Sequence, residues 1–132
     1  MSIQQPMTFL GFDYGEKRVG VSVGNTLTAL ARPLITIDAV GKVRWAKIEA
    51  LINEWLPDAL VVGVPFHPDG AEHENTIKAR KFSRQLHGRF NLVVHEVDER
   101  YTTTSAHEMG ATGQDADAQA AAIILEQYLN NR

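Results

Sequence analysis

The sequence predicts an α/β domain: a five-stranded mixed sheet flanked by helices, with three antiparallel strands first and two parallel strands added through helical crossovers. Two observations predict this fold class. Residues 19–24 alternate valines with very small side chains at the period of two that is typical of a strand. Farther on, apolar residues at helical spacing alternate with short apolar runs, which is typical of strand–helix–strand units. The expected order is βββαβαβα, with a short helix before the last one.

Length and composition limit the classes of protein that fit. The 132 residues predict one domain over residues 1–132, large enough to bury a core without disulfides. There are no cysteines, which excludes thiol chemistry and zinc sites of the cysteine type. No signal sequence or membrane span is visible, so we expect a soluble cytoplasmic protein with no membrane partner. The net charge of −3 argues against nucleic-acid binding by bulk positive charge.

The first part of the chain predicts a hairpin and an edge strand. Phe9 to Phe12 is β-prone, and Val19 to Gly24 alternates valines with Gly or Ser, so residues 14–18 form the loop, with Gly15 expected at positive φ. One face of the second strand carries only Gly20, Ser22 and Gly24, which predicts that something packs close to its backbone. Residues 31–37 predict a third strand, placed at an edge by Pro33.

The remaining elements follow from apolar spacing. Residues 42–56 predict an amphipathic helix that ends at Pro57, and residues 59–64 predict a central strand that is buried on both faces. We expect a loop over 65–70, a helix over 71–88, a buried strand over 92–97, a short helix from the caps at 102–105 to Gly110 or Gly113, and a final helix capped by Asp115.

Three acidic points stand at ends of these elements. Asp13 ends the first strand, Asp98 and Glu99 follow the 92–97 strand, and Asp117 lies on the core-facing stripe of the last helix. Neighbouring strand side chains point to opposite faces, so only one of Asp98 and Glu99 is expected to face Asp13. Each acid has a structural alternative: a turn cap at Asp13, a surface pair with Arg100, and helix-dipole stabilisation at Asp117.

Together the three acids predict an oxygen-ligand site for Mg²⁺ or Mn²⁺. Such ions activate water and stabilise the leaving oxygen of a phosphodiester. If one strand lies between those that bear Asp13 and Glu99, their backbones are about 10 Å apart, a span that side chains and ions bridge. The basic run Lys78, Arg80, Lys81, Arg84 and Arg89 would hold the phosphates, with a solvated helix face as the alternative.

Four motifs resemble those of the YqgF/RuvX family in order and spacing: FDYGEKRVGVSVG, ALVVGVPFHPDG, HEVDERYTT and DADAQAAAIILEQYL. The resemblance covers nearly the whole chain. It implies a ribonuclease H-like fold related to the RuvC Holliday junction resolvase, and a role in maturing the 5′ end of 16S ribosomal RNA. By motif, Asp13, Glu99 and Asp117 are the implied catalytic residues and metal ligands, with Asp98 as a second candidate. The stretch SAHEMGATGQDA is shorter than the loop of many relatives.

We therefore expect a metal-dependent endonuclease, a monomer or homodimer, with RNA ahead of DNA as its partner. The ribosome or a pre-ribosomal particle is a further candidate partner. The residues expected to contact nucleic acid are Lys17, Arg18, Lys78, Lys81, Arg84 and Arg100. The alternatives are a junction-resolving DNA nuclease and a non-catalytic RNA-binding assembly factor. A phosphotransferase would need two lobes, and the chain supplies one.

Overall fold

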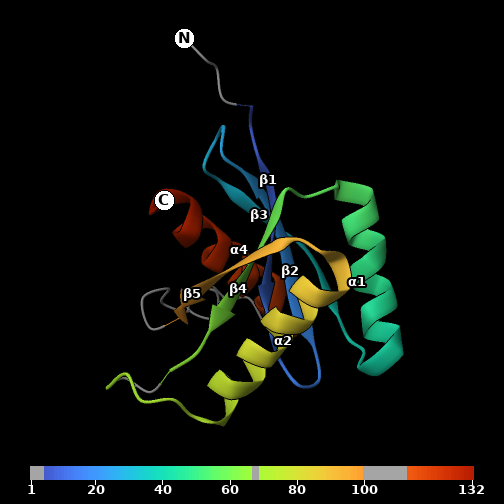
Figure 1. Cartoon of the computed structure of the whole chain (residues 1–132), viewed down its shortest axis with the longest axis vertical. Helices are drawn as coiled ribbons and strands as arrows, with labels where there is room; N and C mark the ends of the chain where they lie inside the picture. Colours follow the sequence, from blue (N-terminus) through green and yellow to red (C-terminus); the bar gives the residue numbers. More distant parts are fainter. Residues whose placement is uncertain (1–4, 67–68, 100–112) are drawn as a thin grey trace.

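The computed structural model describes residues 5–66, 69–99 and 113–132 (Figure 1). Its sheet has the five predicted strands, in the order β3-β2-β1-β4-β5. The strands are β1 (Thr8–Asp13), β2 (Val19–Asn25), β3 (Ala31–Ile37), β4 (Ala59–Val64) and β5 (Val93–Asp98). The first three pair antiparallel, while β4 pairs parallel with both β1 and β5. The mixed sheet is as predicted, and β4 lies between the strands that lead to Asp13 and Glu99.

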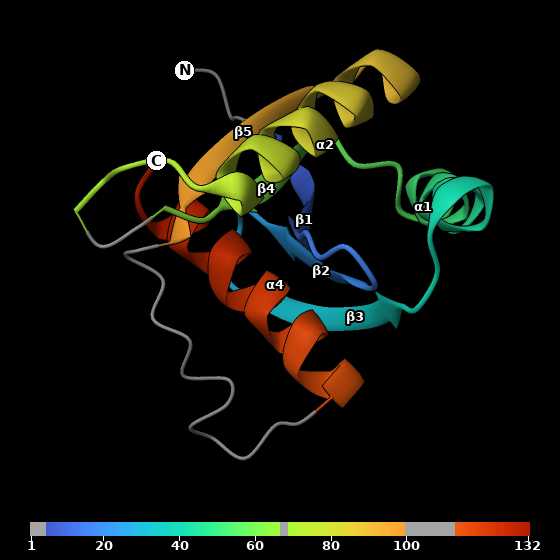
Figure 2. The same cartoon turned by 90° about the horizontal axis from the view of Figure 1, so that it is seen from below.

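Helices cover both faces of the sheet, as Figure 2 shows from below. The helices α1 (Gly41–Trp55) and α2 (Glu74–Phe90) contribute Ile48, Phe82 and Leu86 to a core on one face. The helix α4 (Gly113–Asn130) contributes Ile124, Leu125 and Leu129 to a second core on the other face. Within the described ranges, no helix is long and apolar enough to span a bilayer.

Two helix starts differ from the prediction. The helix α2 begins at Glu74 instead of residue 71, because His73 caps it: the Asn75 N–H donates to His73 Nδ1 at 3.0 Å, and the His73 N–H donates to Thr76 Oγ1 at 3.1 Å. The helix α4 begins at Gly113, so Asp115 lies within the helix and not before its first residue. The short helix expected from residues 102–105 to Gly110 or Gly113 lies outside the described residues.

The strand β5 is not the buried strand that the sequence predicted. It is an edge strand that pairs with β4, and Val93 is exposed. Its apolar run resembles that of a central strand because Val94 packs on the core beneath α1 and α2 and Val97 on the core beneath α4, while its free edge meets solvent. The other edge is β3, as Pro33 predicted, and its pairing with β2 is irregular at Val21 and Ser22, where Pro33 enters the ladder.

The prediction for Gly15 was also wrong. Among the described residues, the glycines at positive φ are Gly41 and Gly70. A β-carbon at Gly15 would lie 2.5 Å from the Arg18 carbonyl oxygen, so this position needs glycine for space and not for an unusual φ. The small-residue face of β2 has the close neighbour that was predicted: Ser22 Oγ donates to the Ala121 carbonyl of α4 at 2.8 Å.

Candidate active site

Asp13 lies at the carboxyl end of β1 on the face that α4 covers. Strand alternation puts Phe9, Gly11 and Asp13 on this face, and Phe9 packs in the α4 core. In the register of the sheet, Asp13 stands between Gly20 of β2 and Gly63 of β4. Because both neighbours lack a side chain, other groups come close to Asp13 on either side: the Asp117 backbone over Gly20, and the Glu99 and Ile124 side chains over Gly63.

The structure brings Glu99 to Asp13 across β4. Val97 pairs with Gly63, and Glu99 follows two residues later on the same face. A β-carbon at Gly63 would lie 2.6 Å from Glu99 Oε1, so the Glu99 side chain lies over the glycine, and its carboxyl group hydrogen-bonds with that of Asp13. Asp98 pairs with Val64, and alternation turns it to the opposite face. The second candidate, Asp98, is therefore the acid that the structure does not bring to Asp13.

Burial raises the pKa of both carboxyl groups, and the negative charge of neighbouring acids raises each pKa further. Desolvation raises the pKa of Asp13 well above its ordinary value, and the charges of Glu99 and Asp117 raise it further. Desolvation is also the main cause of the raised pKa of Glu99, with a smaller contribution from Asp98. Two carboxyl groups in contact cannot both ionise without cost, and a bound cation would reduce that cost.

Asp117 is the third predicted acid, and it lies close enough for its charge to affect Asp13. Its side chain is partly exposed and accepts a hydrogen bond from Arg18 Nε at 3.0 Å. An acid on a core-facing stripe needs hydrogen bonds or a cation, and the chain itself supplies both in Arg18. Among the residues that the structure describes, no three acidic or histidine side chains converge closely enough to hold an ion.

The residues present fit a divalent cation in their chemistry. Asp13 and Glu99 supply carboxylate oxygens, which hard cations prefer, and Gly63 leaves the room that Glu99 needs. A cation between the two carboxylates would also offset the negative charge of Glu99 that raises the pKa of Asp13. Asp117 would join them only if its carboxylate left Arg18.

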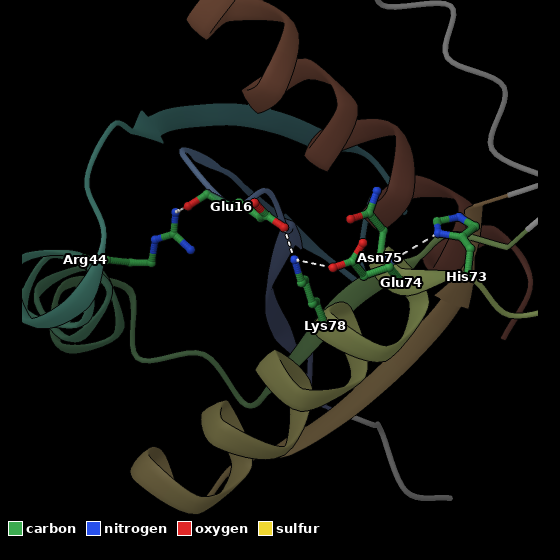
Figure 3. A network of polar contacts seen from close by, with 6 residues as sticks. All are labelled: Glu16, Arg44, His73, Glu74, Asn75 and Lys78. Atoms are coloured by element: carbon green, nitrogen blue, oxygen red, sulfur yellow. Dashed lines mark hydrogen bonds and ion pairs between the residues drawn. The ribbon is translucent and has the colours of Figure 1, made fainter.

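The residues predicted to contact nucleic acid differ in whether they already form ion pairs within the protein. Lys17, Lys81 and Arg84 are exposed. Lys78 is paired with Glu16 and, at 3.2 Å, with Glu74 (Figure 3). The hydrogen bond with Glu16 raises the pKa of Lys78 and lowers that of Glu16. Lys78 is therefore committed within the protein, and Arg100 lies outside the described residues.

Sequence reasoning missed Arg44, which holds the β1–β2 loop in place. Arg44 is buried in the first turn of α1, and it donates from Nε to the Ala39 carbonyl at 2.7 Å and from Nη2 to the Glu16 carbonyl at 2.9 Å (Figure 3). Its guanidinium lies 5.7 Å from the Tyr14 ring centroid. A lone arginine in a predicted helix gave no signal, because both of its acceptors are backbone carbonyls and one of them, at Glu16, is 28 residues away in the sequence.

A comparison with protein families identifies the relatives of this chain. The sequence model of the RuvX family, described as Holliday junction resolvase, matches residues 7–131. The chain belongs to the RuvX family. Two curated relatives, from Albidiferax ferrireducens and a Polaromonas species, are each 61% identical over 124 residues, which is 94% of this chain and 78% or 88% of the relative. Both carry the name "Putative pre-16S rRNA nuclease".

Solved structures agree on the fold of this RuvX-family chain. RuvC of Thermus thermophilus in complex with a Holliday junction substrate aligns with a TM-score of 0.60 and 19% identity, covering 93% of each chain. A second structure of Thermus thermophilus RuvC aligns with a TM-score of 0.56 and 16% identity. The likeness shows that the chain has the ribonuclease H-like fold of RuvC. The expected family and fold are confirmed.

Proposed function

We infer that this chain is a metal-dependent endonuclease that cleaves precursor 16S ribosomal RNA, maturing its 5′ end. The observation that carries the proposal is the contact between Asp13 and Glu99 over Gly63, at the carboxyl ends of β1 and β5. These two acids come from segments 86 residues apart in sequence (99 minus 13), and their raised pKa values mark a pair that a cation would stabilise. Family membership supports a phosphodiester hydrolase, and the names of the relatives favour RNA.

In this proposal Asp13, Glu99 and Asp117 hold Mg²⁺ or Mn²⁺. The bound ions would activate water and stabilise the leaving oxygen of the phosphodiester. Arg18 and Lys17 lie on the loop that joins β1 to β2, so they would bind the sugar-phosphate backbone next to the acids. Lys81 and Arg84, exposed on α2, would hold more distant phosphates.

A DNA junction is the second candidate substrate, favoured by the RuvC-like fold and by the description of the family. Resolution of a four-way junction needs two sites related by symmetry, whereas RNA cleavage needs one. A ribosome-assembly factor that binds RNA without cutting it is the third possibility. It predicts tight binding with no product.

The test is cleavage of a labelled precursor 16S fragment and of a four-way DNA junction, side by side, with Mg²⁺, with Mn²⁺ and with EDTA. The proposal expects the RNA to be cut in the presence of either ion and to stay intact in EDTA. The Asp13→Asn variant controls for contaminating nucleases, because it removes a proposed ligand while preserving shape. Faster cleavage of the junction would favour the resolvase, and RNA binding without cleavage would favour the assembly factor.

A further inference from the structure

The ion pair between Arg18 and Asp117 joins the β1–β2 loop to the first turns of α4. Arg18 Nε lies 3.0 Å from Asp117 Oδ2, and the two side chains are 41% and 30% exposed. Asp117 is one of the three acids proposed above to hold the cation, and the inference rests on that proposal. A positive group of the chain therefore sits on a carboxylate that a metal ion would also need.

The backbone on the Asp117 side of the pair has little freedom. The Asp117 carbonyl oxygen lies in the space that a β-carbon on Gly20 would need, and Ser22 Oγ holds the Ala121 carbonyl one turn later at 2.8 Å. The first turns of α4 thus contact β2 at two points, one turn apart. Arg18 is the partner that can move, because it is a long side chain with a large exposed fraction on a loop.

Electrostatic interactions determine which partner Arg18 contacts when a divalent ion binds. The ion attracts the Asp117 carboxylate and repels the guanidinium, which then needs another anion. A phosphate of the nucleic-acid backbone is a strong partner for a guanidinium. We propose that Arg18 is a positioning residue that holds Asp117 in the ion-free protein and transfers to a backbone phosphate of the nucleic acid when an ion takes Asp117.

This exchange couples ion binding to nucleic-acid binding. Each ligand releases the residue that the other needs, so each raises the affinity for the other by the same factor. Without ions, Arg18 contributes little to RNA binding unless Asp117 is removed. Lys17 offers a matched comparison, because it lies next to Arg18 in the same loop, is exposed, and forms no ion pair with Asp117 among the described contacts.

The first measurement is a double-mutant cycle for binding of a fluorescent single-stranded RNA, followed by anisotropy in EDTA. Arg18→Gln should weaken binding about two- to fivefold more in the Asp117→Ala background than in the wild type, as expected for release from a partly exposed ion pair. Lys17→Gln should weaken binding equally in both backgrounds. Equal losses for Arg18→Gln in the two backgrounds would overturn the exchange.

The second measurement is calorimetric titration of Mn²⁺ into the RNA-free protein. Arg18→Gln should bind Mn²⁺ about two- to fivefold more tightly than Lys17→Gln, because it removes the competitor for Asp117 as well as a nearby positive charge. If the two variants bind Mn²⁺ with equal affinity while the wild type cleaves RNA with Mn²⁺, the role of Arg18 is overturned and the proposed nuclease activity stands. A wild type that neither binds Mn²⁺ nor cleaves either substrate would overturn the proposed function and the exchange together.

Discussion

The backbone carbonyl oxygen of Asp117 lies where a β-carbon on Gly20 would have to stand. Through this contact the start of α4 packs directly on β2. The contact lies next to Asp13, which pairs with Gly20 in the sheet. A single missing side chain therefore sets how close the third acid comes to the first. The same face carries Gly63 on the other side of Asp13, where the missing side chain makes room for Glu99.

Gly20→Ala should destabilise the fold. The new β-carbon meets backbone atoms of Asp117 and Ala118, which cannot turn aside, so α4 must shift. Overpacking of this kind costs about 1–3 kcal/mol, measured as the free energy of unfolding in urea. Gly88→Ala in α2 is the matched control: a β-carbon there meets nothing within 4 Å, and it should gain about 0.5–1 kcal/mol from helix propensity. Equal stability changes in the two variants would contradict the close packing of the Asp117 backbone on Gly20.

Gly63→Ala should lower cleavage activity by displacing Glu99. Its β-carbon would come too close to Glu99 Oε1 and to Ile124 Cδ1, both ends of flexible side chains, so the fold should survive. Adding Ile124→Val removes the second clash and leaves the first. The double variant should therefore regain the stability of the wild type in a thermal melt without regaining activity. Recovery of both together would show that packing against Ile124 is the whole effect.

Asp13→Asn should reduce cleavage by orders of magnitude, because it removes a charge that a divalent cation needs. The ion-free protein should be as stable as the wild type or more stable. Since burial and Glu99 raise the pKa of Asp13 in the folded state, ionising it costs folding free energy as the pH rises through that pKa. Below the ordinary value of 3.8 the group is protonated in both states, and the cost disappears.

Urea unfolding in EDTA at several pH values checks the stability part of this prediction. The advantage of Asp13→Asn over the wild type should be greatest near neutral pH and vanish in acid. A structural turn cap at Asp13 predicts the reverse: a loss of about 1 kcal/mol, by analogy with helix caps, and nearly full activity. A variant that is less stable yet fully active would falsify the assignment of Asp13 to the site.

Replacing Lys81 and Arg84 by Ala should weaken RNA binding and reduce its dependence on salt. Both side chains are exposed on α2, so the fold should be unaffected. Loss of two phosphate contacts should make the slope of log K against log salt shallower by about 1.4 for single-stranded RNA. Lys47→Ala, an exposed lysine on α1, is the control. A slope that stays the same in the double variant would make this basic run a solvated helix face.

Lys78→Ala should change that salt slope less than either Lys81→Ala or Arg84→Ala. Lys78 is paired with Glu16 and Glu74, so its charge is already balanced within the protein. Its loss should instead loosen the β1–β2 loop, which hydrogen exchange of residues 14–18 would detect. A slope change as large as that of Lys81→Ala would mean that Lys78 leaves its acidic partners when RNA binds.

The sequence by itself determined the elements and the acids at their ends. Strand alternation in Val19 to Gly24 and helical spacing from Ile48 to Trp55 are local patterns, so the strands and the three helices could be predicted within a few residues. Alternation also showed that only one of Asp98 and Glu99 could face Asp13. The exposed edge of β5 and the start of α2 at Glu74, after the His73 cap, could not be predicted, because they depend on the neighbours of those segments and not on their own pattern.

Tertiary structure alone decided which charges meet. Glu99 reaches Asp13 because Gly63, in the strand between them, has no side chain, and Asp117 turns to Arg18 from a helix 99 residues farther along the chain. Lys78 forms an ion pair with Glu16, and Arg44 donates a hydrogen bond to the Glu16 carbonyl. No spacing in the sequence predicts either contact. Electrostatic interactions depend on the distances between charges in the folded protein, which the sequence does not give directly. Hydrophobic periodicity is a local property of the sequence and can be recognised without the fold.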